Sequence, residues 1–426
     1  MWYFFYNTGL LLASPLIFLL LLAKKRCRRG LPQRLGFLPE SLCQSSRPVL
    51  WVHAVSMGEA VAVAPLVRGL HTLCPEERII VSTVTETGRE AVEKYLANVA
   101  EHCYAPLDFP WVVRRVVRML NPRAFLFVET EIWPNLLRTL HTQSIPSVLV
   151  NGRFSSRSFR GYRLIRPLIS RILGPLSLCL MQSDRDAQRA TALGARPDRV
   201  FRTGNIKFDQ PPVEQREEGP SRWTLGLADH EELLVAGSTH PVEEEELLAC
   251  YRTLRAEFPT LMLLLAPRHI ERVGQVEHAV RAAGLKPVRR TALDQNGTRE
   301  RGPGRVIILD TRGELSQVYR HAVLSFVGGT LVPVGGHNLL EPASWGKPVF
   351  YGRYTDHCAE IADQLSEGGG GIRVQNGMQL AVEMAKLLRD RELLRETGRA
   401  ACEVVNRNRG ALERTLELLG TVLSKP

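Results

Sequence analysis

The sequence predicts an α/β protein built from two Rossmann-like domains that face each other across a cleft. From residue 49 onward, short apolar runs of strand length alternate with helical patterns, as in a doubly wound parallel sheet. The alternation stops at the polar, proline-containing segment 209–221 and restarts beyond it. At 426 residues, the chain exceeds one ordinary core and has room for two domains and an appendage. We expect a ligand between the two sets of strand ends.

The appendage is the N-terminal segment 1–23, which has the composition of a membrane anchor. Residues 2–23 are almost wholly apolar, and the basic run KKRCRR follows at residues 24–29. A helix of about 20 residues can cross a hydrocarbon core about 30 Å thick. A cleaved signal peptide is the competing interpretation, but no positive charge precedes the apolar run. We therefore expect a single-pass anchor, a basic juxtamembrane linker at residues 24–46, and the remaining chain in the cytoplasm.

The first domain is expected at residues 47–210 and the second at residues 222–426, joined by a linker at residues 211–221. The first has candidate strands at residues 49–54, 78–83, 124–129, 147–151, 178–182 and 200–203, with helices at 86–96, 111–120 and 133–141. The second has candidate strands at residues 233–237, 261–266, 306–310, 322–327, 348–351 and 371–374, with helices at 243–257 and 274–283.

The composition and motifs of the chain limit the classes of partner and of metal or nucleotide site that it could have. The chain has 55 basic and 44 acidic residues, so its formal charge is +11. This charge favours nucleic acid, acidic lipid or phosphorylated substrates as partners. The eight cysteines form no C-x-x-C pair and no regular spacing, so neither a zinc site nor a disulfide framework is indicated. Zincin and P-loop motifs are absent from the sequence.

A first candidate site follows the strand at residues 49–54. Ser56 and Glu59 lie where this strand turns into a helix, at the edge of a parallel sheet where such folds bind ligands. Glu59 could act there as a general base. The S-x-x-E spacing equally fits a capping box, and on this stretch alone the cap is the favoured interpretation.

A second candidate site is the glycine-rich stretch 326–343. Its glycines, at positions 328, 329, 335 and 336, would let backbone N–H groups approach a phosphate, and a helix expected near Asn338 would add its positive end. Glu341 could accept hydrogen bonds from a ribose diol. Plain turn chemistry is the alternative, but the acidic turn 310–314 and the strand end APRH (266–269), with Arg268 suited to a phosphate, favour a nucleotide site.

These motifs together resemble the 3-deoxy-D-manno-oct-2-ulosonic acid (Kdo) transferases, which move Kdo from CMP-Kdo to the lipid A precursor of Gram-negative bacteria. The resemblance extends over nearly the whole chain. Its motifs include HAVSMGE (53–59), ETEIWPNLL (129–137), GNIKFD (204–209), APRH (266–269), DTRGEL (310–315) and GGHNLLEPA (335–343), and several are specific in combination, notably E-T-E-x-W-P and G-G-H-N-x-L-E-P-A. It implies an inverting, metal-independent glycosyltransferase of GT-B architecture at the inner membrane, with no cofactor. By analogy with that fold, the helix at residues 410–423 would cross back to the first domain.

The resemblance also implies roles for particular residues. Glu59 matches the family's catalytic base, which reverses the preference for a mere cap. Glu129 and Lys207 match positions that support the transition state. The segments that would hold CMP comprise Pro267, Arg268, Arg312, Gly313, Glu314, Asn338, Leu339, Leu340 and Glu341.

An arginine-rich stretch at residues 153–171 suggests a membrane contact. Six arginines recur at spacings of three to five, interleaved with apolar residues, which on one helix would give a cationic face suited to anionic headgroups. A solvated basic face is the alternative, and nucleic acid is the least favoured partner because the anchor already implies a membrane. Two other functions stay open: a membrane-bound GT-B enzyme using a UDP-sugar, and a non-catalytic protein that binds anionic lipid.

Overall fold

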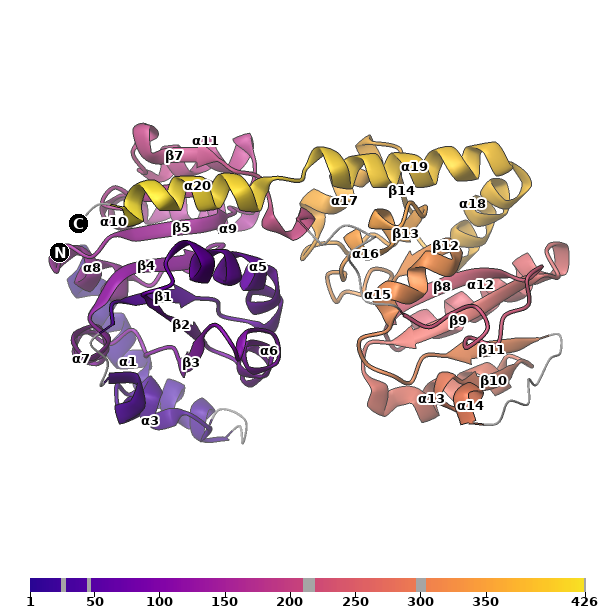
Figure 1. The fold of residues 1–426 in the computed structure, drawn as a ribbon, viewed down its shortest axis with the longest axis horizontal. Helices are drawn as coiled ribbons and strands as arrows, with labels where there is room; N and C mark the ends of the chain where they lie inside the picture. The colour runs from indigo at the N-terminus through magenta and orange to yellow at the C-terminus, as the bar shows by residue number, and fades with distance from the viewer. Residues whose placement is uncertain (24–27, 44–46, 210–218, 296–303, 425–426) are drawn as a thin grey trace. The chain divides into compact units, whose positions relative to one another are not determined.

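The computed structural model describes residues 1–23, 28–43, 47–209, 219–295 and 304–424, and its chain divides into two compact units (Figure 1). The first unit comprises Met1–Asp209 with Asn408–Pro426, and the second comprises Gln210–Arg407. Each contains a seven-stranded parallel sheet, which confirms the predicted pair of Rossmann-like domains. The basic residues 24–27 and most of the expected linker 211–221 lie outside the described residues.

The first unit alternates strands and helices, as predicted, after its N-terminal helices. Its strands are β1 (Val49–His53), β2 (Arg78–Thr83), β3 (Glu101–Tyr104), β4 (Pro122–Val128), β5 (Ser147–Gly152), β6 (Leu178–Met181) and β7 (Val200–Arg202). Its helices are α1 (Trp2–Ala23), α3 (Leu31–Arg34), α4 (Glu40–Cys43), α5 (Met57–Leu73), α6 (Glu86–Leu96), α7 (Pro110–Leu120), α8 (Pro134–Thr142), α9 (Ser156–Leu164), α10 (Arg166–Leu173), α11 (Asp184–Leu193) and α20 (Ala411–Leu423), with short 3-10 turns η1 (Pro197–Arg199) and η2 (Ile206–Phe208).

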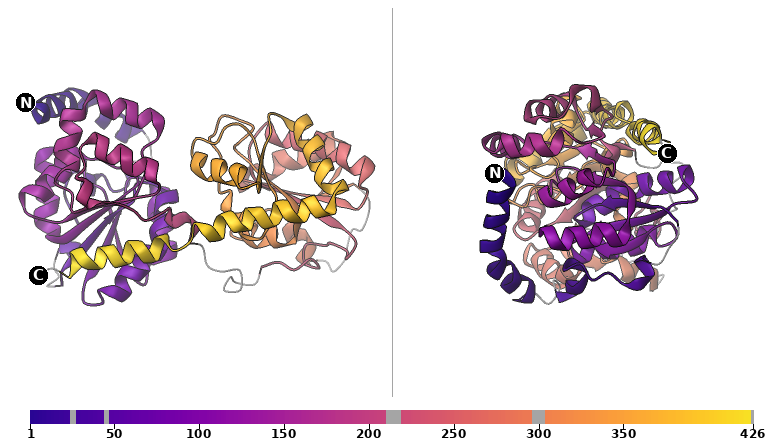
Figure 2. Two further views of the ribbon diagram at one scale, coloured as in Figure 1. Left: turned by 90° about the horizontal axis from the view of Figure 1, so that it is seen from above. Right: turned by 90° about the vertical axis from the view of Figure 1, so that its left-hand side faces the viewer.

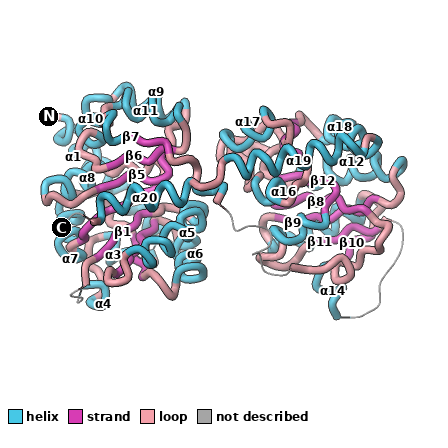
Figure 3. The backbone as a smooth tube through the Cα atoms, turned by 45° about the horizontal axis from the view of Figure 1, so that its top comes forward, coloured by secondary structure: helices cyan, strands magenta, loops and turns pink. Residues whose placement is uncertain are grey.

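The sheet of the first unit is buried on both faces. Its strand order is β3-β2-β1-β4-β5-β6-β7, and successive side chains alternate between two apolar clusters. Trp51 packs in the cluster that includes α7, α8, α10 and α11, while its neighbours Leu50 and Val52 pack in the cluster that includes α5, α6 and α20. Figure 3 shows the magenta strands enclosed between cyan helices. This burial explains why the strands read as continuous apolar runs in the sequence.

Helix α20 belongs to the first unit although it ends the chain. It packs on α5, and Leu419 and Leu423 lie in the same core as the strands β1 and β4. A Cβ atom at Gly69 of α5 would lie 2.5 Å from Leu416 of α20, so the glycine permits this close approach. The expected second domain, residues 222–426, therefore differs from the second unit by this helix, which joins the first unit as the fold analogy suggested.

The second unit repeats the architecture. Its strands are β8 (Glu232–Thr239), β9 (Leu261–Pro267), β10 (Lys286–Arg289), β11 (Arg305–Ile308), β12 (Ala322–Val327), β13 (Val349–Tyr351) and β14 (Gly371–Arg373), in the order β10-β11-β9-β8-β12-β13-β14. Its helices are α12 (Glu243–Glu257), α13 (Val273–Ala282), α14 (Arg290–Gln295), α15 (Leu315–Val318), α16 (Leu340–Ser344), α17 (Ala359–Glu367), α18 (Gly377–Arg389) and α19 (Arg391–Arg407), with 3-10 turns η4 (Ile270–Arg272) and η5 (Tyr319–His321).

Helix α1 lies along one side of the first unit (Figure 2, right). It is long and apolar enough to cross a membrane by length and composition. Its half-buried residues include Tyr3, Asn7, Leu10, Ser14, Ile17 and Leu21, which recur at spacings of four and three and so form one stripe along the helix. Tyr6 donates a hydrogen bond to Asp108 (2.8 Å), and Asn135 donates one to Asn7 (2.6 Å). The first two turns of α1 are thus attached to the folded unit.

The arginine-rich stretch 153–171 forms two helices, α9 and α10, rather than one. The break falls at Ile165, and Pro167 occupies the first turn of α10, where its missing N–H costs nothing. Helix α10 buries Leu168, Ile169 and their neighbours in the core, whereas no residue of α9 is buried. A single continuous cationic face along this stretch is therefore not formed.

Candidate active site

The candidate catalytic residues of the first unit gather where its strand order reverses. Strands β1 and β4 are neighbours although two strands separate them in sequence. Glu59 follows β1, and Glu129 directly follows β4, so both leave the carboxyl edge of the sheet on either side of this reversal. In open α/β sheets, this point forms a crevice that binds ligands.

Glu59 lies in the first turn of α5, and its carboxylate is held by two donors. The backbone N–H of Val55 lies 2.8 Å from Oε2, and the Ser56 hydroxyl lies 3.0 Å from Oε1. Ser56 is the N-cap residue of α5, and its side chain accepts from the backbone N–H of Glu59. The capping interaction predicted from the S-x-x-E spacing is therefore present, and the same contacts fix the orientation of a candidate base.

Burial and a neighbouring negative charge give the Glu59 carboxyl an unusually high pKa. Burial of the carboxyl, reinforced by the negative charge of Glu129, raises the pKa of Glu59 from 4.5 to about 7. A group with this pKa exchanges a proton readily near neutral pH, which suits general acid–base catalysis. A simple capping carboxylate would have a pKa at or below its usual range, because its hydrogen bonds favour the charged form.

Glu129 and Lys207 form an ion pair beside this group. Lys207 Nζ lies 2.7 Å from Glu129 Oε1, and the two side chains are 30% and 22% exposed. Glu129 has a left-handed backbone conformation, with φ at 57°, which is rare for a residue with a side chain. Its N–H donates to the carbonyl of Val150 at 3.0 Å, so the neighbouring strand end holds this conformation. The loop that carries Lys207 is fixed by Asn151, whose side chain accepts from the N–H of Ile206 at 3.1 Å.

Three other side chains near this edge, Glu131, Trp133 and His53, are partly or fully buried and make contacts within the protein. The indole N–H of Trp133 donates to Glu131 at 3.1 Å, and Trp133 packs edge-on against His53 with ring centroids 5.4 Å apart. His53 is fully buried, and burial lowers its pKa to about 4. Burial raises the pKa of Glu131. Trp133 is partly buried and packs against the main core of the unit.

The second unit brings its predicted nucleotide-binding segments to one sheet edge. Strands β11, β9, β8 and β12 are consecutive neighbours, and all of them are parallel. Their carboxyl ends lead respectively into residues 310–314, Pro267–Arg268, His240 and the glycine-rich stretch that begins at Gly328. Segments as far apart in sequence as His240 and Gly328 therefore meet at one edge of the parallel sheet.

The glycine-rich loop does not offer its glycine N–H groups to a ligand, which corrects the expectation from sequence. The N–H of Gly328 donates to the carbonyl of Gly237 (2.8 Å), and that of Gly329 donates to the Glu243 carboxylate (2.7 Å). The N–H groups of Gly335 (3.1 Å) and Gly336 (2.8 Å) both donate to the carbonyl of Gly329. These contacts fold the loop on itself, because a glycine-rich backbone can bond internally as readily as it can bond a phosphate.

Glu243 is a residue whose role here the sequence did not reveal. Its buried carboxylate accepts from the N–H groups of Gly329 (2.7 Å), Thr330 (2.9 Å), Leu331 (2.9 Å) and His240 (3.0 Å). It fills the position that a bound anion would take in such a nest of N–H groups. The only signal in the sequence is the acidic run 243–246, which reads as an ordinary first turn of a helix.

Arg268 lies beside a cluster of three histidines. His240 Nε2 and His337 Nε2 are 2.8 Å apart with their rings stacked, and His269 packs edge-on against His240. Burial, followed by the charge of Arg268, lowers the pKa of His337 to about 3. Arg268 is exposed and has no carboxylate partner in the described part of the chain. Burial also lowers the pKa of His240, so Arg268 is a fixed positive charge beside a His240–His337 pair that is held neutral, an arrangement that favours an anion.

The remaining predicted contacts are distributed along the same edge. Arg312 is exposed and pairs with Glu271 (3.2 Å), and Gly313 has φ at 92°. Glu314 accepts from the Thr311 hydroxyl (2.7 Å). The side chains of Leu339 and Leu340 are fully buried, so only their backbone could meet a ligand, while Asn338 donates to Glu341 (3.2 Å). Trp345, which directly follows α16, donates to the carbonyl of Ser316 in α15 (2.6 Å) and so ties these two segments together.

Comparison with known proteins identifies the family. A model described as 3-deoxy-D-manno-octulosonic-acid transferase (kdotransferase) matches residues 29–210. The chain is 36% identical to a 3-deoxy-D-manno-octulosonic acid transferase of Haemophilus influenzae, with all of both chains covered, and 32% identical to one of Aquifex aeolicus, over 83% of this chain and 89% of that protein. A solved UDP-GlcNAc 2-epimerase from Neisseria meningitidis bound to UDP-GlcNAc aligns with a TM-score of 0.61 over 87% of this chain and 99% of its own, and at 14% identity this likeness shows the fold alone. The chain belongs to the 3-deoxy-D-manno-octulosonic acid (Kdo) transferase family and is a glycosyltransferase.

Proposed function

We propose that the enzyme transfers Kdo from CMP-Kdo to a sugar hydroxyl of the tetra-acylated lipid A disaccharide precursor, with inversion at the anomeric carbon. The observation that carries this proposal is Glu59, a carboxyl with a pKa of about 7 at the point where the strand order of the first sheet reverses. An acceptor hydroxyl must lose its proton as it attacks, and Glu59 is the group best suited to take it.

The reaction balances with Glu59 as the only proton acceptor. Its carboxylate takes the proton of the acceptor hydroxyl while the hydroxyl oxygen bonds to the anomeric carbon of Kdo. The bond from that carbon to the phosphate oxygen of CMP breaks, and its electron pair leaves with CMP. The donors from Val55 and Ser56 hold the carboxylate in one orientation throughout. Lys207, oriented by Glu129, would balance negative charge on the donor as the bond breaks.

The second unit would bind the CMP portion of the donor. Arg268 is exposed, with a guanidinium available to meet the phosphate, and the His240–His337 pair lies beside it. The segments Arg312–Glu314 and Asn338–Glu341 lie on the same sheet edge and would hold the nucleoside. We propose that Arg268 and Lys207 neutralise the leaving group without a metal ion.

The acceptor is a lipid, so we propose that the enzyme works at the inner membrane with both units on the cytoplasmic side, attached through α1. The predicted single-pass anchor requires residue 1 to lie beyond the membrane. Where the hydrogen bonds of Tyr6 and Asn7 with the first unit are kept at the membrane, the first two turns of α1 would instead lie on the cytoplasmic side. Labelling the variant Trp2→Cys with an impermeant thiol reagent distinguishes these two arrangements, because only a crossing helix exposes this cysteine on the outer side of the inner membrane.

The test of the reaction uses purified protein, CMP-Kdo generated in place, and the tetra-acylated precursor, with a chelator present and no added metal. Mass spectrometry of the lipid should show a gain of one or more Kdo masses, and Glu59→Gln should lower the rate of this gain by about 100-fold or more. Activity that appears only when a divalent ion is restored would refute metal independence. No gain with active donor would reject this donor and acceptor, and a panel of UDP-sugars would then test the alternative enzyme.

A further inference from the structure

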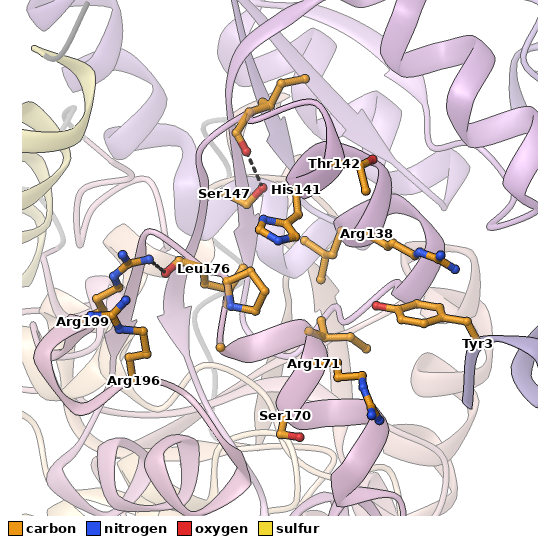
Figure 4. Close-up of a pocket in the computed structure, with 15 residues that line it drawn as sticks. Tyr3, Arg138, His141, Thr142, Ser147, Ser170, Arg171, Leu176, Arg196 and Arg199 are labelled. Atoms are coloured by element: carbon orange, nitrogen blue, oxygen red, sulfur yellow. Dashed lines mark hydrogen bonds between the residues drawn. The ribbon is translucent and has the colours of Figure 1, made fainter. Parts of the chain in front are cut away.

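A second pocket of the first unit lies at the amino edge of its sheet, away from Glu59. It has a volume of about 640 Å³ and is lined by the end of α8, the end of α10, the turn η1 that precedes β7, and Tyr3 of α1 (Figure 4). Ser147, which begins β5, also lines it. Glu59 and Glu129 leave the carboxyl edge of the same sheet, so this pocket takes no part in the proposed reaction.

The pocket combines an apolar floor with a basic rim. Its floor includes the buried side chains of Leu137, Ile172 and Leu176, which belong to the main core of the unit. Its rim carries Arg138, Arg171, Arg196 and Arg199, and no acidic residue is among those that line it. This is the composition of a site for an amphipathic anion.

The hydrogen bonds of the rim orient the guanidinium groups but leave most of their charge unbalanced. Arg171 donates to the carbonyl of Pro167 (3.0 Å), Arg199 donates to that of Leu176 (3.0 Å), and Arg138 lies over the Tyr3 ring at 4.4 Å. Only Arg196 has a carboxylate partner among the described residues, Asp198 at 2.9 Å.

The helix ends beside the pocket offset only part of this charge. Two helices, α8 and α10, end at the pocket, and each helix end contributes about half a negative charge. Three arginines without a carboxylate partner therefore retain about two positive charges, more than is needed to stabilise the helix ends.

The neighbouring surface of α1 indicates which anion fits. Tyr3, at the mouth of the pocket, begins a helix whose outward face is apolar and uncovered: Phe4 is 69% exposed and Leu12 is 78% exposed. The opposite stripe of α1 is the one that packs on the unit. An uncovered apolar face beside a basic pocket matches a phospholipid. The acyl chains would lie on the apolar face, and the phosphate would enter the basic pocket.

We propose that this pocket binds the phosphate of an anionic glycerophospholipid whose acyl chains lie along the uncovered face of α1. The site is separate from the acceptor site and would hold α1 in the surface of one leaflet. The proposal rests on the membrane attachment suggested above and is independent of the Kdo reaction.

The test measures partition of the full-length protein between buffer and vesicles of phosphatidylcholine with and without phosphatidylglycerol. The double variant Arg138→Gln/Arg171→Gln should bind the phosphatidylglycerol vesicles about thirtyfold more weakly, since each basic side chain at an anionic surface contributes about 1 kcal/mol. Its binding to pure phosphatidylcholine should not change. The matched control, Arg252→Gln/Arg399→Gln, removes the same charge from exposed positions of the second unit and should retain the preference.

Two further measurements distinguish a phospholipid site from an effect of net charge and from a site for any anion. Thr142→Trp fills the mouth of the pocket without changing charge and should weaken binding of short-chain dihexanoyl phosphatidylglycerol in calorimetric titration. Inorganic phosphate should bind at least tenfold more weakly than that lipid. Equal losses of vesicle binding in the pocket variant and the control variant would assign the effect to net charge. Equal affinities for free phosphate and for dihexanoyl phosphatidylglycerol would make this a site for any anion. Either result overturns the proposal. Kdo transfer to detergent-dispersed acceptor should persist in the pocket variants, so failure here and failure of the proposed reaction are distinguishable.

Discussion

Substituting Glu59 by glutamine separates its catalytic from its structural contribution. In the proposed mechanism, only the deprotonated carboxylate accepts a proton, so kcat/KM of the wild-type enzyme should rise with pH through about 7 and then level off. Glu59→Gln cannot accept the proton and should lower turnover by about 100- to 10,000-fold, the usual contribution of a general base.

The same substitution should lower activity but increase stability relative to wild type as the pH rises. Between pH 4.5 and about 7 the unfolded chain has lost the Glu59 proton while the folded chain still holds it, so the free energy of unfolding falls as the pH rises through this window. The rise in the pKa of Glu59 from 4.5 to about 7 corresponds to about 3 kcal/mol. Glutamine carries no charge, so the stability of Glu59→Gln relative to wild type should increase by about that amount between about pH 4 and about pH 8.

The assay combines initial rates of Kdo transfer with urea unfolding of both proteins across this pH range. Glu129→Gln should move the rise in kcat/KM to lower pH, because it removes the negative charge that helps to raise the pKa of Glu59. If Glu59→Gln retained more than about a tenth of wild-type turnover at high pH, or if the relative stability did not depend on pH, Glu59 would be a cap and not the base.

Three further substitutions test the second unit and the C-terminal helix. Arg268→Ala should raise the KM for CMP-Kdo at least about tenfold, whereas Arg312→Ala, whose side chain is already in an exposed ion pair, should change it less than about threefold in the same titration. Glu243→Gln should lower the free energy of unfolding of the second unit by about 2–4 kcal/mol, because an amide oxygen cannot accept from every N–H that the carboxylate serves, and an unchanged urea midpoint would contradict this. Leu419→Ala should destabilise the first unit by about 2–5 kcal/mol in the same experiment, since it opens a cavity in a fully buried position.

The sequence was sufficient to predict the central strands of both sheets but not two of the edge strands. The buried strands β1, β4, β8 and β12 are apolar over their whole length, and alternation with helices predicts them. Strands β3 and β10 went unpredicted because Glu101–Tyr104 and Lys286–Arg289 are short and polar. Each lies at an edge of its sheet, where a strand pairs on one side only and need not be apolar.

The site residues could be named from the motifs, whereas their electrostatics depend on distant partners. The raised pKa of Glu59 arises from burial and from Glu129, which is 70 residues further along the chain. The glycine-rich loop suggested a phosphate cradle, but Glu243, which precedes it by more than 80 residues, occupies its N–H groups. The left-handed conformation of Glu129 is likewise invisible in sequence, because a neighbouring strand end imposes it.

The place of α20 in the first unit has a consequence for synthesis in the cell. A ribosome releases residues 210–407, the whole second unit, before it releases the helix that completes the first unit. Until then, α5 lacks the apolar cover that α20 provides. Helix α5, whose first turn carries Glu59, therefore completes its packing only at the end of translation, and a chain stopped before residue 408 would present this uncovered helix to chaperones and proteases.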